Sequence, residues 1–247
     1  MPQRLKLIVA YDGAAFAGWQ SQTHRNTVQD HLEQAFRKVN GRPVQVHGAG
    51  RTDAGVHALA QCAHVDLADR RLTAAKWTTA LNALLPPTIR ILRCQYVSEK
   101  FHARFSAKGK IYRYRIWAAP ILPPLELNRA WHISAPLDRA FLKTAAEKFV
   151  GSHDFAGFAA NRGKPETNTT RTIRSIRVGG RGPLMTLEFD GDGFLYKMVR
   201  LIVGAIVDVA VGRSAIAGIV RRLDSKCTNG PRLCAPAEGL LLVRVWY

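Results

Sequence analysis

The order of the secondary-structure signals constrains the fold most, because one pattern occurs twice. In the first half, hydrophobic periodicity predicts a strand, a helix, two strands, a helix and a strand. The predicted bounds are Arg4 to Tyr11, Val28 to Val39, Val44 to Ala49, Gln61 to Leu67, Thr73 to Leu84 and Ile89 to Val97. Thr27 and Asp30 form a capping signature before the first helix, and Pro86 and Pro87 end the second.

The second half repeats this order without a residue-level repeat. Its predicted elements are Gly109 to Trp117, Arg139 to Val150 behind Asp138, Thr172 to Val178, Leu184 to Asp190, Phe194 to Val211 and Leu240 to Trp246, with a short extra helix from Ser214 to Leu223. We therefore predict an α+β fold of two ferredoxin-like βαββαβ halves. The polar stretch Phe101 to Lys108 predicts the boundary, with domains at residues 1–104 and 105–247.

A large excess of positive charge narrows the choice of partner. The chain of 247 residues has 36 Lys and Arg against 18 Asp and Glu, a formal charge of +18. Lys100 to Arg115 contains six basic residues and no acid, and Arg162 to Arg181 contains six with Glu166 as the one acid. Such segments suit contact with phosphates, and a solvated basic surface is the alternative. The longest apolar run, Leu201 to Val211, is too short to span a membrane and contains Asp208.

Cysteine and histidine spacing argues against disulfides and against a metal site. Four cysteines without a C-x-x-C pair are scattered along the chain, at Cys62, Cys94, Cys227 and Cys234. We expect buried free thiols. His57 and His64 are close in sequence but lack a paired acid or cysteine at ligand spacing. The N-terminal residues predict a first strand and not a signal peptide, so we expect a cytoplasmic protein.

The stretch GAGRTDAGVHALAQ, Gly48 to Gln61, contains one acid, Asp53. Its glycines let the backbone approach a ligand closely. Neighbouring Arg51 and a distant arginine such as Arg200 would favour the ionised carboxylate, which could then act as a nucleophile at neutral pH. A structural Arg/Asp pair in a tight turn is the alternative, and spacing alone does not decide between them.

The stretch KGKIYRYRIW places aromatic and basic residues side by side. Strand alternation puts Tyr112 and Tyr114 on one face and Ile111, Arg113 and Arg115 on the other. An aromatic ring beside a cation suits a splayed-out base and its phosphate. Ordinary cross-strand packing is the alternative explanation.

A single arginine interrupts the apolar surface of the helix predicted in DGDGFLYKMVRLIVGA. Arg200 lies in the middle of that surface. A buried guanidinium requires a carboxylate or phosphate partner, because an unpaired buried charge is costly. The alternative is that its side chain extends to solvent.

Five segments in the same order resemble the tRNA pseudouridine synthase A (TruA) family, and its bacterial members in particular. They are YDGAAFAGWQ, GAGRTDAGVHALAQ, FHARFSAKGKIYRYRI, DGDGFLYKMVRLIVG and APAEGLLLVRVWY. The resemblance implies a pseudouridine-synthase fold with a central, mostly antiparallel sheet and a basic cleft. It also implies a homodimeric isomerase that converts uridine to pseudouridine at positions 38 to 40 of the tRNA anticodon stem-loop, without a metal or organic cofactor.

The resemblance also implies roles for individual residues. Asp53 matches the catalytic aspartate, and Tyr112 matches the tyrosine that packs on the target base. Arg200 matches the arginine that pairs with the aspartate, and Arg51 matches the one that helps expel a base and bind phosphate. We expect further RNA contacts from the basic segments, at Lys108, Lys110, Arg113 and Arg171.

The sequence leaves several alternatives open. Leu201 stands where relatives commonly have asparagine, without touching a named chemical role. Asp53 would attack C1′ of the ribose or C6 of the uracil, or would remove a ribose proton to give a glycal. Two other function classes share some of these features: an RNA-binding module without catalysis and a base-removing glycosylase.

Overall fold

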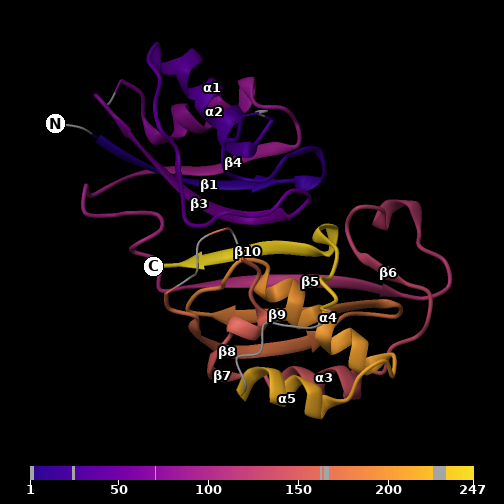
Figure 1. The fold of residues 1–247 in the computed structure, drawn as a ribbon. Coiled ribbons are helices and arrows are strands. Elements are labelled where there is room, and N and C mark those ends of the chain that lie inside the picture. The colour runs from indigo at the N-terminus through magenta and orange to yellow at the C-terminus, as the bar shows by residue number, and fades with distance from the viewer. Residues whose placement is uncertain (1–2, 24–25, 70, 162, 164–166, 225–231) are drawn as a thin grey trace. The chain divides into compact units, whose positions relative to one another are not determined.

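The computed structural model describes residues 3–23, 26–69, 71–161, 163, 167–224 and 232–247 (Figure 1). The chain divides into two compact units. The first unit is Met1–Lys108 with Leu241–Tyr247, and the second is Gly109–Leu240. The change between units therefore falls four residues after the expected boundary at 104/105. The last strand, which we expected in the second domain, groups with the first unit instead.

The first unit has a ferredoxin-like order of strands and helices. Its elements are β1 Gln3–Tyr11, α1 Val28–Asn40, β2 His47–Gly48, β3 His57–Leu67, α2 Ala74–Leu84 and β4 Ile89–Val97. β1 pairs antiparallel with β3 and β4, and β2 pairs with β3, so the strand order is β4-β1-β3-β2. β10 (Leu240–Trp246) pairs in parallel with β3, where Leu241 lies opposite His57. This pairing explains why the last strand groups with the first unit.

Alternation along β1 builds the core of the first unit. Leu5, Leu7 and Val9 are fully buried, while the residues between them are partly exposed. Helices α1 and α2 lie over one face of this sheet (Figure 1). The rings of Phe36 and Trp77, one from each helix, pack with centroids 5.3 Å apart. The expected capping box and the Thr73 and Asp138 caps of two later helices are all confirmed.

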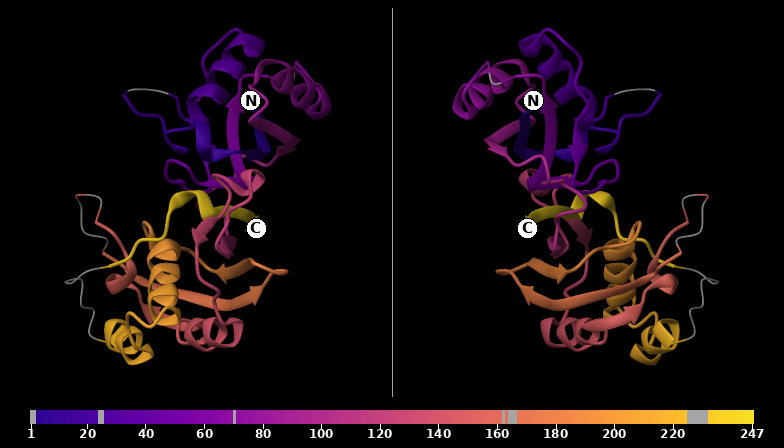
Figure 2. Two further views of the ribbon diagram at one scale, coloured as in Figure 1. Left: turned by 90° about the vertical axis from the view of Figure 1, so that its right-hand side faces the viewer. Right: turned by 90° about the vertical axis from the view of Figure 1, so that its left-hand side faces the viewer.

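The second unit is a four-stranded antiparallel sheet with a short additional strand. Its elements are β5 Gly109–Ala118, β6 Trp131–Ile133, α3 Arg139–Glu147, β7 Gly151–Asp154, β8 Thr170–Gly179, β9 Leu184–Gly191, α4 Met198–Ala210 and α5 Ile216–Asp224. The order is β5-β9-β8-β7, and β6 pairs in parallel with β5. The three helices gather beside β9, β8 and β7 (Figures 1 and 2). The predicted α+β class with mostly antiparallel strands is confirmed.

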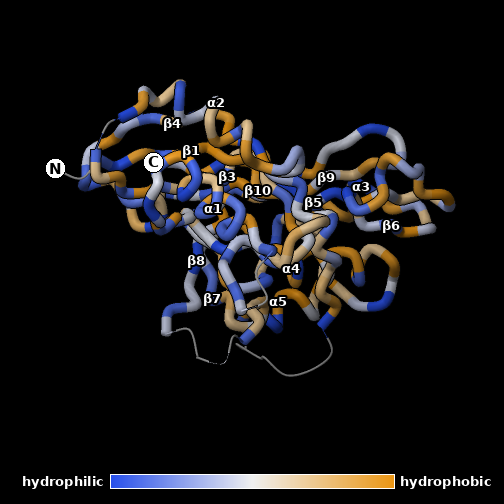
Figure 3. Tube along the Cα trace, turned by 90° about the horizontal axis from the view of Figure 1, so that it is seen from above, coloured by the Kyte–Doolittle hydropathy of each residue, from blue (hydrophilic) through white to orange (hydrophobic). Residues whose placement is uncertain are grey.

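Helix α4 differs from its prediction at its start. We expected the helix to begin at Phe194, but it begins at Met198 because Lys197 has a left-handed φ of 58°. Most of α4 is coloured on the hydrophobic side of the scale in Figure 3, and Leu201 is 5% exposed within it. An apolar side chain at Leu201 therefore fits the core. Gly204 is required by packing, because a Cβ there would lie 1.8 Å from the Leu233 carbonyl oxygen.

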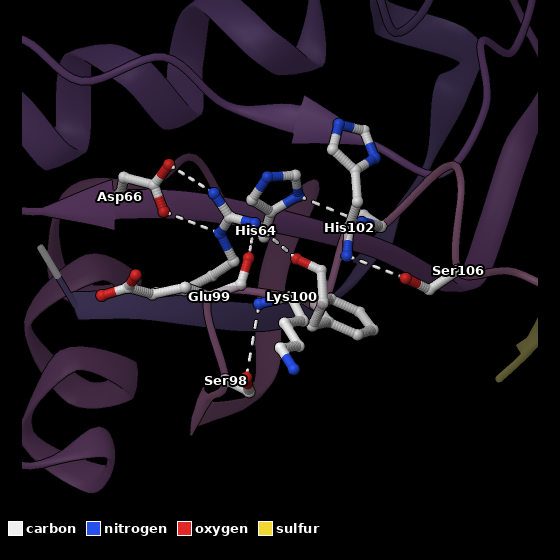
Figure 4. Close-up of polar contacts among 10 residues, drawn as sticks. His64, Asp66, Ser98, Glu99, Lys100, His102 and Ser106 are labelled. Carbon is white, nitrogen blue, oxygen red and sulfur yellow. Dashed lines mark hydrogen bonds and ion pairs between the residues drawn. The ribbon is translucent and has the colours of Figure 1, made fainter.

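Three histidine rings pack together in the first unit. His64 on β3 is 1% exposed, and its ring centroid lies 5.0 Å from that of His47 and 4.6 Å from that of His102. Its Nδ1 accepts a hydrogen bond from the Ala103 N–H at 3.2 Å, so this nitrogen carries no proton and the imidazole is neutral (Figure 4). Burial lowers the pKa of His64 to about 4, and the positive charge of Arg4 adds to this effect.

This shift predicts a loss of stability in acid. The folded pKa of His64 lies below the ordinary value of 6.5, so the unfolded chain takes up the proton first as pH falls. The contribution of His64 to stability is constant above about pH 6.5 and is lost between pH 6.5 and about 4, by about 3 kcal/mol in total. Glutamine can accept the same hydrogen bond but does not titrate. We expect His64→Gln to show a shallower decline than wild type in urea unfolding measured at several pH values.

The matched control is His132→Gln, because His132 is exposed in the second unit. It should keep the wild-type pH dependence. Identical pH profiles for His64→Gln and wild type would contradict the assignment of this titration to His64.

Candidate active site

The loop between β2 and β3 carries Asp53 and is anchored to the first strand and the segment that follows it. The Thr52 hydroxyl lies 2.8 Å from the Tyr11 hydroxyl, and both side chains are buried. The Thr52 carbonyl accepts a hydrogen bond from the Trp19 N–H at 3.1 Å. Burial raises the pKa of Tyr11 to about 12, so it stays a neutral hydrogen-bonding group. These contacts fix the backbone immediately before Asp53.

Close packing around the loop leaves no room for side chains at two glycines. A Cβ on Gly48 would lie 2.5 Å from the indole of Trp19, and one on Gly18 would lie 2.7 Å from the Thr52 carbonyl oxygen. Gly18 also has a left-handed φ of 96°. Gly55 has a φ of 81°, and the Val56 N–H closes the turn onto the Asp53 carbonyl at 3.1 Å.

Asp53 itself is partly exposed, so its carboxylate can reach a ligand, and Arg51 is exposed. The Arg51 Nε donates to the Gln20 amide oxygen at 3.2 Å. Gln20 comes from the segment YDGAAFAGWQ, for which the sequence alone predicted no role in the site. That segment supplies Tyr11, Gly18, Trp19 and Gln20, and its aromatic and glycine residues directly after a strand are the signal that could have identified it.

A second polar pair lies at the other end of the loop. His57 Nδ1 lies 3.1 Å from the Asp12 carboxylate and 3.0 Å from the Gly13 N–H. Gly13 has no room for a side chain, because a Cβ there would lie 2.0 Å from the Val56 carbonyl oxygen. The first segment of the chain thus holds both ends of the Asp53 loop.

The prediction that Tyr112 and Tyr114 share one face of β5 is confirmed. Tyr112 is 8% exposed and Tyr114 is fully buried, while Ile111, Arg113 and Arg115 on the opposite face are partly exposed. The Tyr112 ring meets Phe194 edge-on, with centroids 5.2 Å apart. The Tyr114 hydroxyl donates to the Pro236 carbonyl at 2.7 Å, and burial raises the pKa of Tyr114 well above its usual range.

Arg200 on α4 is held by the segment that precedes β10. Its Nε donates to the Ala235 carbonyl at 2.7 Å, and the Ala235 N–H donates back to the Arg200 carbonyl at 3.1 Å. Its positive charge acts on Tyr114 and opposes the rise in that tyrosine's pKa. The second unit therefore brings Arg200 close to Tyr114. Asp53 and Arg51 belong to the first unit.

The four expected RNA contacts differ in their surroundings. Lys108 is exposed, and Lys110 lies on β5 opposite Gly191. Arg113 is engaged by Glu188, with Nη2 to Oε2 at 2.7 Å. Arg171 donates to two backbone carbonyls at 2.9 and 2.6 Å. Part of the second basic segment, at 162 and 164–166, lies outside the described residues.

Buried free thiols are confirmed at Cys62 and Cys94, and burial raises the pKa of both, that of Cys94 to about 11. Cys234 is free and partly exposed, and Cys227 lies outside the described residues. Among the residues that the structure describes, no group of three His, Cys, Asp or Glu is arranged to hold a metal ion. Within the same ranges, none of the helices combines the length and apolar character needed to cross a membrane.

Comparison with known proteins identifies the family. The model of a family described as tRNA pseudouridine synthase matches residues 7–106 and 145–247, which include the Asp53 loop and Arg200. The chain belongs to this family. This match and the bacterial relatives described next together confirm the predicted resemblance to the bacterial TruA type, and with it membership of an isomerase family.

Several curated relatives carry the name tRNA pseudouridine synthase A. One from Akkermansia muciniphila is 46% identical over 99% of this chain and 95% of its own length. Relatives from Acetivibrio thermocellus and Maridesulfovibrio salexigens are 39% and 42% identical, each over 99% of this chain and over 100% and 90% of their own lengths. The likeness to these synthases therefore extends over nearly the whole chain.

The packing of Gly48 against Trp19 predicts a sensitive position in this synthase. Gly48→Ala would place a methyl group 2.5 Å from the indole, and relieving that overlap should cost about 1–3 kcal/mol of stability and displace the loop. We expect a lower urea midpoint and reduced turnover on tRNA. Gly218→Ala is the control, because nothing lies within 4 Å of a Cβ there. Wild-type stability in Gly48→Ala would show that the loop does not depend on this contact.

Proposed function

We propose that the chain isomerises uridine to pseudouridine at positions 38 to 40 of the tRNA anticodon stem-loop, with Asp53 as the catalytic carboxylate and no cofactor. The observation that carries the proposal is the Asp53 loop. A single acid projects from a backbone that is fixed on both sides, with Thr52 bound to Tyr11 and Trp19. The family membership of the chain supports the reaction type.

The reaction itself explains why a fixed carboxylate suffices. The bond between C1′ of the ribose and N1 of the uracil must break, the base must turn, and C5 must join C1′. Substrate and product contain the same atoms, so no co-reactant is consumed. Asp53 would act on C1′ or C6, or by removing a ribose proton. Holding the detached base in the site makes recombination faster than escape.

The remaining site residues would each add to this chemistry. The target uridine would leave the stem-loop, and stacking on Tyr112 would offset the few kcal/mol that extrusion costs. The edge-on contact with Phe194 holds the Tyr112 ring in place. Arg200 would favour the ionised carboxylate. Arg51, tied to Gln20 at 3.2 Å, would bind phosphate and help expel the base.

Phosphate contacts would come from the basic segments, with Lys108, Lys110 and Arg171 as the main candidates. Arg113 would contribute less, because it is already paired with Glu188 at 2.7 Å. The first unit carries the Asp53 loop, and the second unit carries Tyr112 and the Arg200 helix. The basic cleft, the homodimer and the cytoplasmic location expected from the sequence stay predictions.

Catalysis and binding should separate at Asp53. Because the amide in Asp53→Asn keeps the size but loses the negative charge, we expect tritium release from tRNA labelled at uridine C5 to fall by more than about 10³-fold. The Kd for tRNA should stay near the wild-type value. Asp53→Ala should behave the same way, and Asp69→Asn, which removes a carboxylate from a surface ion pair, should release tritium normally. Substantial turnover by Asp53→Asn would show that another group performs the chemistry.

The basic contacts should appear in the salt dependence of binding. Each lost phosphate contact should reduce the slope of log affinity against log salt by about 0.7–0.9. We expect such reductions for Lys110→Gln and Arg171→Gln in titrations of tRNA at increasing salt. Arg71→Gln is the matched control, because Arg71 is an exposed arginine paired with Asp69 outside both basic segments. An unchanged slope in both test variants would remove these residues from the interface.

A further inference from the structure

One large aromatic side chain of the first unit is held out in solvent. Phe105 is 77% exposed, in the loop that follows β4. A single exposed apolar side chain is common on protein surfaces, so exposure alone assigns Phe105 no role. The surroundings of Phe105 therefore bear on what it contacts.

A series of packed histidine rings supports the Phe105 ring. The Phe105 ring lies on His102, with centroids 4.3 Å apart and planes tilted by 31°. His102 in turn meets the buried His64, and His64 stacks on His47 with an angle of 21° between the planes. The stack thus runs from an exposed ring to β2, directly before the Asp53 loop.

The backbone beneath Phe105 is also fixed. His102 Nδ1 accepts hydrogen bonds from the N–H groups of Arg104 and Phe105, at 3.1 and 3.2 Å. The His102 N–H donates to the Ser106 hydroxyl at 2.9 Å (Figure 4). The Ala103 carbonyl accepts from the Tyr247 hydroxyl at 2.8 Å. These bonds therefore hold the backbone that carries the Phe105 ring.

Arg4 ties the start of this loop to the sheet. It makes a bidentate ion pair with Asp66 at 2.7 Å and donates to the carbonyls of Glu99 and Phe101 (Figure 4). The positive charge of Arg4 thereby compensates the negative charge of Asp66. A platform that is ordered before binding loses little conformational entropy when a ligand stacks on it.

The charge around Phe105 selects the ligand. Lys100, Arg104 and Lys108 are exposed on the same loop, and the sequence from Lys100 to Arg115 contains no acid. The Arg104 guanidinium carbon lies 5.7 Å from the centre of the Phe105 ring. An aromatic ring bordered by cations matches a nucleobase with its flanking phosphates and disfavours a basic or purely apolar partner.

We propose that Phe105 is a stacking platform for an unpaired base of the RNA substrate, and that Lys100, Arg104 and Lys108 bind the adjacent phosphates. The base concerned is one that is bound but not isomerised. The platform would add affinity and register at a point separate from the Tyr112 contact. This inference rests on the proposed function only in taking tRNA as the ligand.

The test compares aromatic and aliphatic replacements of Phe105 in the full chain, using an unmodified tRNA transcript as the probe. We expect Phe105→Leu to raise the Kd by about 5- to 150-fold, the range of one lost base–aromatic stack. Phe105→Trp should bind like wild type. Phe105→Leu should leave the salt slope unchanged, because no charge is lost, while Arg104→Gln should lower it.

Leu92→Ala is the matched control, because Leu92 is a 55% exposed apolar residue on β4, and it should bind tRNA normally. The proposal is overturned if Phe105→Leu binds as tightly as wild type. It is also overturned if Trp and Leu weaken binding equally, or if Phe105→Leu changes only the oligomeric state. These affinities need no chemistry, so a wild-type chain that binds tRNA without isomerising uridine would refute the proposed function and leave this inference standing.

Discussion

The candidate site depends on the hydrogen bonds that hold Thr52 in place. The side chain of Thr52 is bound to Tyr11, and its carbonyl to Trp19, from the first strand and the segment after it. Gly18 and Gly48 exist as glycines because this approach leaves no space for a Cβ. Asp53 is the next residue, so the same contacts hold its backbone in place. A carboxylate positioned before substrate arrives needs little reorganisation during the reaction.

In the first unit, Arg4 and three histidine rings hold the loop that follows β4. Arg4 joins Asp66 to two carbonyls of the loop after β4, and His64 is neutral and buried between His47 and His102. This arrangement lowers the pKa of His64, so the imidazole beneath the loop stays uncharged at neutral pH. Strand β2 connects the ring stack to the Asp53 loop, so one short strand serves both features.

Much of the fold follows from hydrophobic periodicity and capping residues, but tertiary contacts override them in places. β6 and β7 are three and four residues long, too short to show a period. The predicted start of α4 was wrong by four residues. Lys197 adopts a left-handed conformation, which the apolar spacing of the sequence does not reveal. Alternation correctly gave the face of Tyr112. The roles of Tyr11, Gly18 and Trp19 were missed because the glycine and aromatic residues after the first strand do not show that this segment packs on the distant Asp53 loop.

Product mapping on a single substrate tests the central claim most directly. An unmodified tRNA transcript is incubated with the wild-type chain, and pseudouridine is located by carbodiimide labelling. A pseudouridine synthase would convert uridine to an isomer of equal mass at positions 38 to 40, and the carbodiimide would then label that isomer. Unchanged RNA would instead identify a binding protein, and abasic sites with free uracil would identify a glycosylase. Either of those results would contradict the account.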